Sequence, residues 1–196
     1  MDENKKSGSK NNMIEIRIHG RGGQGAKSAS QLIVEAALDQ GKQIQAFPES
    51  GPERTGAPMK TYARISDRPI TTYEPVLEPD TVLVIDPTLI GQIDVTEGLK
   101  KDGVLIVNTV GSSADIRKKT GFGGKVYTVD ATGISIDLIG RNLPNTPMIG
   151  ALIKVTNVIE MRFVEKRVQE MFLKKIGQEK TDANISAIKR AFDEVK

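Results

Sequence analysis

The chain has 196 residues and no cysteine, which excludes disulfides, a cysteine nucleophile and a cysteine-ligated iron–sulfur cluster held by this chain alone. Hydrophobic residues make up 38% and charged residues 27%, as in a folded globular protein, and the single histidine, His19, offers little for a histidine metal site or a Ser-His-Asp triad. The net charge of +3, with five Phe, three Tyr and no Trp, makes nucleic acid a weak candidate partner.

Residues 1–12 are polar and charged and contain no apolar run. We expect them to form a disordered tail rather than a signal peptide. Residues 13–196 are expected to form a single α/β domain. No later run approaches the roughly 18 apolar residues that a membrane-spanning helix needs, so the sequence predicts a cytoplasmic protein that does not enter a membrane.

The first part of the domain alternates strands with a helix. Isoleucine at every second position over residues 14–18 predicts a strand. Apolar residues at helical spacing over 26–36 predict the helix, and Gly41 is a typical residue to end it. Two further strands are predicted over residues 43–47 and 60–65, on either side of a loop dense in Gly, Pro and charge.

Compact apolar runs mark the middle of the chain. After a turn and a short extended piece around Ile70, they predict buried parallel strands over residues 82–85, 104–107 and 125–129. Helix or turn is predicted between them, around residues 89–99 and 114–119. This alternation predicts an α/β fold, with a mostly parallel, twisted, Rossmann-like sheet and flanking helices.

The remainder predicts a helical C-terminal part, with helices over residues 134–139, 148–157, 164–176 and 185–192. Thr146 followed by Pro147 is a typical helix start, with threonine as the cap and proline at the first helical position. Gly177 is expected to end the third of these helices.

The most informative segment lies between the first strand and the first helix and fits the pattern G-x-G-x-x-G, with the residues Gly20, Arg21, Gly22, Gly23, Gln24 and Gly25. Glycines there permit a tight turn, and the N–H groups at a helix start attract phosphate. Arg21, Lys27 and Ser28 add two positive charges and a hydroxyl nearby. The pattern indicates a phosphate-binding loop, with an ordinary strand-to-helix turn as the alternative.

Two specialised forms of such a loop are poorly matched. A P-loop requires lysine directly after the last glycine, whereas here Ala26 precedes Lys27, so an NTPase is not expected. A dinucleotide site requires an acidic residue at the end of the second strand. Glu49 lies about there, but it belongs to the Pro- and Gly-rich loop, so an NAD site is the weaker prediction.

Three runs together resemble the gamma subunit of 2-oxoacid:ferredoxin oxidoreductases: IHGRGGQGA at residues 18–26, AFPESGPERTGAP at 46–58 and LPNTPMIGA at 143–151. Pyruvate:ferredoxin oxidoreductase is a member of this family. The resemblance follows the family's order from Met13 to the C-terminus. One departure is Thr55-Gly56-Ala57, where many relatives carry a second arginine and two small residues, which leaves the charge of this loop open.

The resemblance implies a division of labour in a complex of alpha, beta, gamma and delta subunits. In this family thiamine diphosphate with magnesium lies on alpha and beta, iron–sulfur clusters lie on beta and delta, and gamma supports assembly and is implicated in coenzyme A binding. The whole enzyme converts pyruvate, CoA and oxidised ferredoxin to acetyl-CoA, CO₂ and reduced ferredoxin. We therefore expect no catalytic residue and no metal ligand here, in agreement with the missing cysteines and with Asp102-Gly103, which lacks the preceding glycine of a thiamine diphosphate motif.

The resemblance also identifies the glycine loop, together with Glu53 and Arg54 of the long loop that follows, as the expected cofactor-binding site for CoA. Packing of the glycine loop against a partner subunit, and an ordinary surface loop with a local ion pair at Glu53 and Arg54, are the alternatives. Residues 142–148 are expected to pack near the glycine loop.

Four other polar residues are candidates for the same region. Asp86, Asn108 and Asp130 each follow a predicted strand, at the sheet edge where ligands of parallel sheets bind. Turn and cap chemistry explains these three equally well. His19 precedes the glycine loop, where it could contact a phosphate or serve as a structural residue.

Three alternative functions stay open at this point. The chain could be the same subunit of a branched-chain, aromatic or 2-oxoglutarate oxidoreductase, since the other subunits are expected to select the oxoacid. It could be a stand-alone Rossmann-like nucleotide-binding reductase, although no Tyr-x-x-x-Lys pattern is present. A pure assembly protein is the third alternative.

Overall fold

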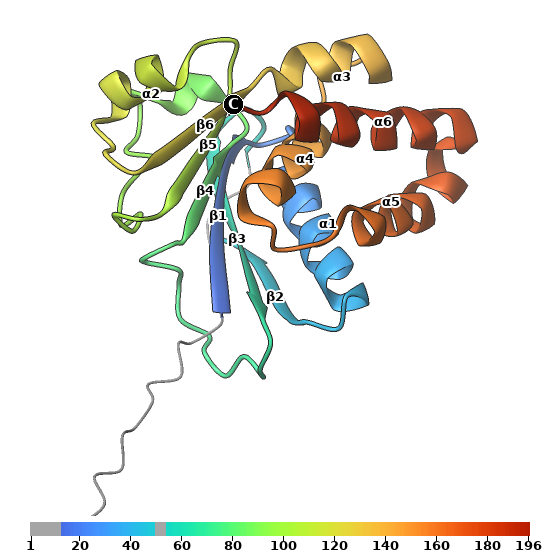
Figure 1. Ribbon diagram of the computed structural model, residues 1–196, viewed down its shortest axis with the longest axis horizontal. Coiled ribbons are helices and arrows are strands. Elements are labelled where there is room, and N and C mark those ends of the chain that lie inside the picture. The colour runs from blue at the N-terminus through green and yellow to red at the C-terminus, as the bar shows by residue number, and fades with distance from the viewer. Residues whose placement is uncertain (1–12, 50–53) are drawn as a thin grey trace, which may run out of the picture.

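A six-stranded sheet forms the centre of the computed structural model, which describes residues 13–49 and 54–196 (Figure 1). The strand order is β2-β3-β1-β4-β5-β6. The strands are β1 Met13–Arg21, β2 Gln43–Pro48, β3 Pro58–Ser66, β4 Thr81–Val84, β5 Val104–Asn108 and β6 Lys125–Val129. The helices are α1 Ala26–Asp39, α2 Ser113–Thr120, α3 Ala131–Ile139, α4 Asn145–Thr156, α5 Met161–Ile176 and α6 Gln178–Glu194, with a 3₁₀ turn η1 at Pro87–Leu89.

Most neighbouring strands are parallel. β1, β4, β5 and β6 run in one direction, and β3 is antiparallel to both β1 and β2. The short strands β4 and β5 are buried on both faces, which explains why they appear in the sequence as continuous apolar runs rather than alternating ones. The predicted α/β class, mostly parallel sheet and helical C-terminal part are confirmed.

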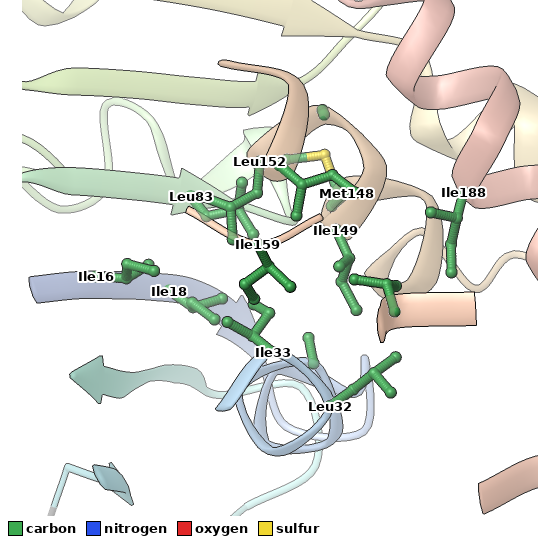
Figure 2. Packing of buried hydrophobic residues seen from close by; sticks show 14 of the residues in the cluster. Ile16, Ile18, Leu32, Ile33, Leu83, Met148, Ile149, Leu152, Ile159 and Ile188 are labelled. Atoms are coloured by element: carbon green, nitrogen blue, oxygen red, sulfur yellow. The ribbon is translucent and has the colours of Figure 1, made fainter. Parts of the chain in front are cut away.

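Different elements cover the two faces of the sheet (Figure 1). On one face α1 and α4 pack over side chains such as Ile16, Ile18 and Leu83, and α5 and α6 pack against these helices, with Leu32, Ile149 and Ile188 in the same cluster (Figure 2). On the other face α2 and the segment between β4 and β5 cover a smaller cluster that includes Val82 and Val84. Successive strand residues point to opposite faces, so adjacent positions of β4 serve different cores.

The helices α4 and α6 approach each other closely at Gly150. A Cβ atom at this position would overlap the carbonyl oxygen of Ile188 and lie 3.1 Å from the backbone nitrogen of Phe192. The glycine of the LPNTPMIGA run therefore lets two helix backbones come into contact.

One local prediction is wrong. Thr146 does not cap α4, because the helix already begins at Asn145, with Pro144 at the cap and a hydrogen bond from Met148 N to Pro144 O of 3.0 Å. Thr146 is instead buried in the first turn. The segment around Ile70, predicted as a short extended piece, pairs with no strand among the described residues. The guanidinium of Arg64 donates to the Glu74 carbonyl (2.6 Å), so this segment is held by side chains of the sheet rather than by strand pairing.

Within residues 13–49 and 54–196, no helix is both long enough and apolar enough to cross a membrane. Residues 1–12, predicted to be a disordered tail, lie outside the residues that the structure describes.

Candidate functional site

The glycine loop joins β1 to α1 through two residues that need a left-handed backbone. Gly23 has φ of 94° and Gly25, the N-cap residue of α1, has φ of 80°. Residues with a Cβ rarely adopt such angles, so glycine at these two positions is required by the turn itself. α1 has no acidic residue in its first turn. Its N-terminus therefore keeps the partial positive charge that favours an anion.

Two distant segments pack directly against this loop. Gly22 donates its N–H to the Ala57 carbonyl (2.9 Å) and accepts from Gly56 N (3.0 Å), and a Cβ at residue 22 would overlap the Arg54 carbonyl oxygen. A Cβ at Gly25 would lie 2.6 Å from the side-chain nitrogen of Asn145. The three sequence runs thus meet at one place, and the predicted packing of residues 142–148 near the glycine loop is confirmed.

A pocket of about 460 Å³ opens between the glycine loop and residues 54–60. Its size is that of a small-molecule site. The lining comes from the turn into α1, the end of β2 and the start of β3: Gly22, Gly23, Gly25, Ala26, Lys27, Ser28, Pro48, Glu49, Arg54, Thr55, Ala57, Pro58, Met59 and Lys60.

Positive charge prevails in the part of this lining that the structure describes. Lys27, Arg54 and Lys60 are cations, and Glu49 is the single carboxylate. Glu49 accepts from the Lys60 ammonium (3.4 Å) and from the Tyr62 hydroxyl (3.2 Å), so its charge is partly compensated within the wall. The combination of a helix N-terminus with Lys and Arg side chains suits a phosphate-bearing ligand.

The structure divides the predicted site residues into two groups. Gly22, Gly23, Gly25 and Arg54 line the pocket, whereas Gly20, Arg21 and Gln24 do not. Gly20 packs under α1, where an added Cβ would lie 3.3 Å from that of Ala26. Arg21 and Gln24 turn to Asp86 instead, at 3.1 and 2.7 Å. Glu53 lies outside the described residues.

Only one of the three residues that follow strands reaches the glycine loop. Asp86 does so through Arg21 and Gln24. Asn108 instead donates to the carbonyl of Ile85 (2.8 Å), and Asp130 caps α3 by accepting from Gly133 N (2.8 Å). The prediction of a shared crevice is therefore wrong for Asn108 and Asp130, because Asn108 bonds to the residue that follows β4 and to Thr132 of α3, and Asp130 caps the helix that follows it.

His19 does not contact the pocket, because its side chain is completely buried within the sheet. Neither ring nitrogen has a hydrogen-bond partner among the described residues. Burial, with added repulsion from Arg17 and Lys60, lowers the pKa of His19 to about 3. The phosphate-contact interpretation of His19 is wrong, and the residue is a neutral part of the core.

Sequence reasoning missed Lys60 as a wall residue. Its position on β3 opposite His19 brings it beside the glycine loop. The pairing of β1 with β3 could have located Lys60, but the apolar pattern within one strand does not show which residues of two strands lie opposite each other. Among residues 13–49 and 54–196, no group of three or more His, Asp or Glu side chains could hold a metal ion.

Comparison with known proteins agrees with this architecture. The model of the family described as pyruvate ferredoxin/flavodoxin oxidoreductase matches residues 15–194. The chain is 54% identical to pyruvate synthase subunit PorC of Thermotoga maritima, over 93% of this chain and 95% of that protein. It is 42% identical to the common gamma subunit of the pyruvate/ketoisovalerate oxidoreductases of Thermococcus kodakarensis, over 92% of this chain and 96% of that one.

Solved structures show the same fold. The crystal structure of the T. maritima subunit matches with a TM-score of 0.85 at 52% identity, covering 94% of this chain and 98% of that one. The 2-oxoglutarate:ferredoxin oxidoreductase of Magnetococcus marinus, solved with 2-oxoglutarate, coenzyme A and succinyl-CoA, matches with a TM-score of 0.77 at 19% identity, covering 92% of this chain and 30% of that one. The resemblance seen in the three sequence runs is confirmed, and the chain belongs to the pyruvate ferredoxin/flavodoxin oxidoreductase family, in which it is a gamma subunit.

Proposed function

We propose that this gamma subunit works with alpha, beta and delta subunits that carry thiamine diphosphate, magnesium and the iron–sulfur clusters, in an enzyme that converts pyruvate and CoA to acetyl-CoA and CO₂ while reducing ferredoxin. Its own contribution is to support assembly and to bind phosphate groups of CoA in the pocket between the glycine loop and residues 54–60. The observation that carries the proposal is the meeting of the α1 N-terminus with Lys27, Arg54 and Lys60 in one pocket.

The chemistry of CoA fits this pocket. CoA carries a pyrophosphate and a 3′-phosphate, and both are bound well by helix N-termini and by Lys and Arg side chains. Gly22, Gly23 and Gly25 all line one wall, and Gly23 is exposed with nothing nearer than 3.9 Å to an added Cβ, so a phosphate can approach the backbone closely at that residue. The M. marinus enzyme, which contains a region of the same fold, was solved with CoA bound, which supports CoA as the ligand class.

Sequence identity to the relatives favours pyruvate over a branched-chain acid as the oxoacid. The T. maritima relative, named for pyruvate alone, is 54% identical, whereas the T. kodakarensis relative, shared with a ketoisovalerate enzyme, is 42% identical. Selection of the oxoacid is assigned to the other subunits in this proposal.

Replacing either Lys27 or Arg54 with alanine in the assembled enzyme is expected to raise the KM for CoA about tenfold, because each change removes a phosphate-facing cation. The kcat and the KM for pyruvate are expected to stay close to wild type. Steady-state kinetics with an artificial electron acceptor measures all three. Lys174→Ala, which removes the same charge from the exposed surface of α5, is the matched control. An unchanged KM for CoA in both pocket variants, with assembly intact, would leave assembly as the subunit's only role.

The partners are tested by anaerobic purification of the tagged chain from its native cells. We expect alpha, beta and delta subunits to co-elute as a brown complex with pyruvate-dependent dye reduction. A chain that elutes alone contradicts the proposal. A nucleotide-binding screen on that isolated chain would then test the stand-alone reductase.

A further inference from the structure

Asp86 is a nearly buried carboxylate whose two oxygens are both used within the protein. It follows β4, next to the end of β1, where the Ile85 N–H donates to the His19 carbonyl (2.8 Å). One oxygen accepts from the Gln24 side-chain amide (2.7 Å) and from Arg21 Nε (3.1 Å). The other accepts from the Thr88 N–H (2.9 Å) and hydroxyl (2.6 Å).

Burial by itself would raise the pKa of Asp86. The hydrogen bonds from Thr88 and Gln24 and the charge of Arg21 outweigh this effect and hold that pKa below its ordinary value. Asp86 is therefore an ionised acceptor at neutral pH, with donors on both oxygens.

The two loop residues held by Asp86 in turn hold the pocket wall. Gln24 accepts the Arg21 backbone N–H (2.8 Å), which ties its side chain to the loop. The Arg21 guanidinium donates to the Gly56 carbonyl (3.1 Å), in the segment that pairs with Gly22, and to Gln92 beyond β4 (2.9 Å). One chain of hydrogen bonds thus runs from Asp86 to the glycine loop and to the segment at Gly56, whose neighbours line the pocket.

We propose that Asp86 is a positioning residue for the pocket: through Gln24 and Arg21 it fixes the backbone that receives the ligand's phosphate, without contacting the ligand. This inference rests on the proposed function. Its physical basis is that Arg21 and Gln24 have long, flexible side chains next to the pocket, and their order depends on a fixed acceptor. With both held by Asp86, the wall keeps a single shape before the ligand arrives, which lowers the ordering cost of binding.

The variant Asp86→Asn tests this directly, because it keeps the shape and removes one acceptor. Whichever way the amide turns, its NH₂ group faces an N–H donor, from Thr88 on one side or from Gln24 and Arg21 on the other. In the assembled enzyme we expect backbone amide exchange of residues 22–25 and 54–57 to accelerate roughly tenfold. The KM for CoA is expected to rise about fivefold, with kcat and the KM for pyruvate unchanged.

The matched control is Asp130→Asn, which changes an equivalent carboxylate after β6 that caps α3 and does not touch the loop. This control should leave both the amide exchange of residues 22–25 and 54–57 and the KM for CoA at the wild-type value. If Asp86→Asn fails to assemble, the milder Thr88→Val removes only the hydroxyl that Asp86 and Arg21 share, and it should move both readouts in the same direction.

Amide exchange in Asp86→Asn that is no faster than in Asp130→Asn overturns the inference. The inference also fails if exchange in Asp86→Asn is faster but its KM for CoA is unchanged, while Lys27→Ala and Arg54→Ala raise the KM for CoA. If those two pocket variants also leave the KM unchanged, the proposed CoA site fails. The exchange data then still decide whether Asp86 holds the loop.

Discussion

Replacing Gly150 with alanine is expected to lower the free energy of unfolding of the purified chain by about 3 kcal/mol. Alanine normally favours a helix over glycine by up to about 1 kcal/mol, so the local effect alone would be stabilising. Here the added methyl group would overlap the backbone of α6 at Ile188. A backbone atom cannot rotate away, so α4 and α6 must separate and the packing around Met148 and Ile149 loosens. Urea-induced unfolding followed by circular dichroism measures the loss.

Gly123→Ala is the control for this prediction. It makes the same chemical change at a position where an added Cβ meets nothing within 4 Å. Its midpoint of unfolding should stay within the error of wild type. A Gly150→Ala protein as stable as this control would show that the two helices can move apart at no cost, contrary to the close approach described above.

The fold could be predicted from the sequence largely because its signals are local. Alternation over residues 14–18 and the apolar runs that became β4 and β5 determine strand type, and helical spacing determines α5 and α6. Thr146 shows the limit of this reasoning. Its capping pattern is correct in isolation, but Pro144 begins the helix earlier and the fold buries Thr146 in the first turn.

The sequence predicts where the candidate site lies in the chain, but not where its side chains point. The glycine pattern identified the turn, and its neighbours in the pocket came from the long loop, as expected. Where Arg21 and Gln24 point depends on Asp86, more than 60 residues further along the chain, and on the register of β1 with β4. No spacing rule encodes such a contact. Gly150 is a second example, because glycine is required there by a backbone contact with α6, a helix that begins at Gln178.

The stability of the purified chain is expected to fall by about 2 kcal/mol between pH 7 and pH 5 because of His19 alone. In the folded protein the pKa of His19 is lowered to about 3, since the ring is buried and lies near Arg17 and Lys60. In the unfolded chain it returns to about 6.5. Between these values the unfolded state binds a proton that the native state does not, so stability is full above about pH 6.5 and is lost as the pH falls towards 3.

Carboxylates contribute in a different pH window. The pKa values of Asp86 and Asp94 are lowered in the folded state, the first by hydrogen bonds that outweigh its burial and the second chiefly by a hydrogen bond from Thr96. Their stabilisation is lost only as the pH falls below about 4, the ordinary range of a carboxyl group. A change in stability between pH 7 and pH 5 therefore reports on His19 and not on these two carboxylates.

The variant His19→Leu should remove most of this pH dependence, because no imidazole remains in the chain to take up a proton on unfolding. Urea unfolding at pH 7, 6 and 5 for both proteins measures the difference. The ring protons of the single histidine also give one set of NMR signals, which should not titrate above pH 5 in the folded protein. A midpoint near 6.5 would show that water or a partner reaches the ring. His19 would then be a group that can exchange protons beneath the glycine loop, rather than a neutral residue of the core.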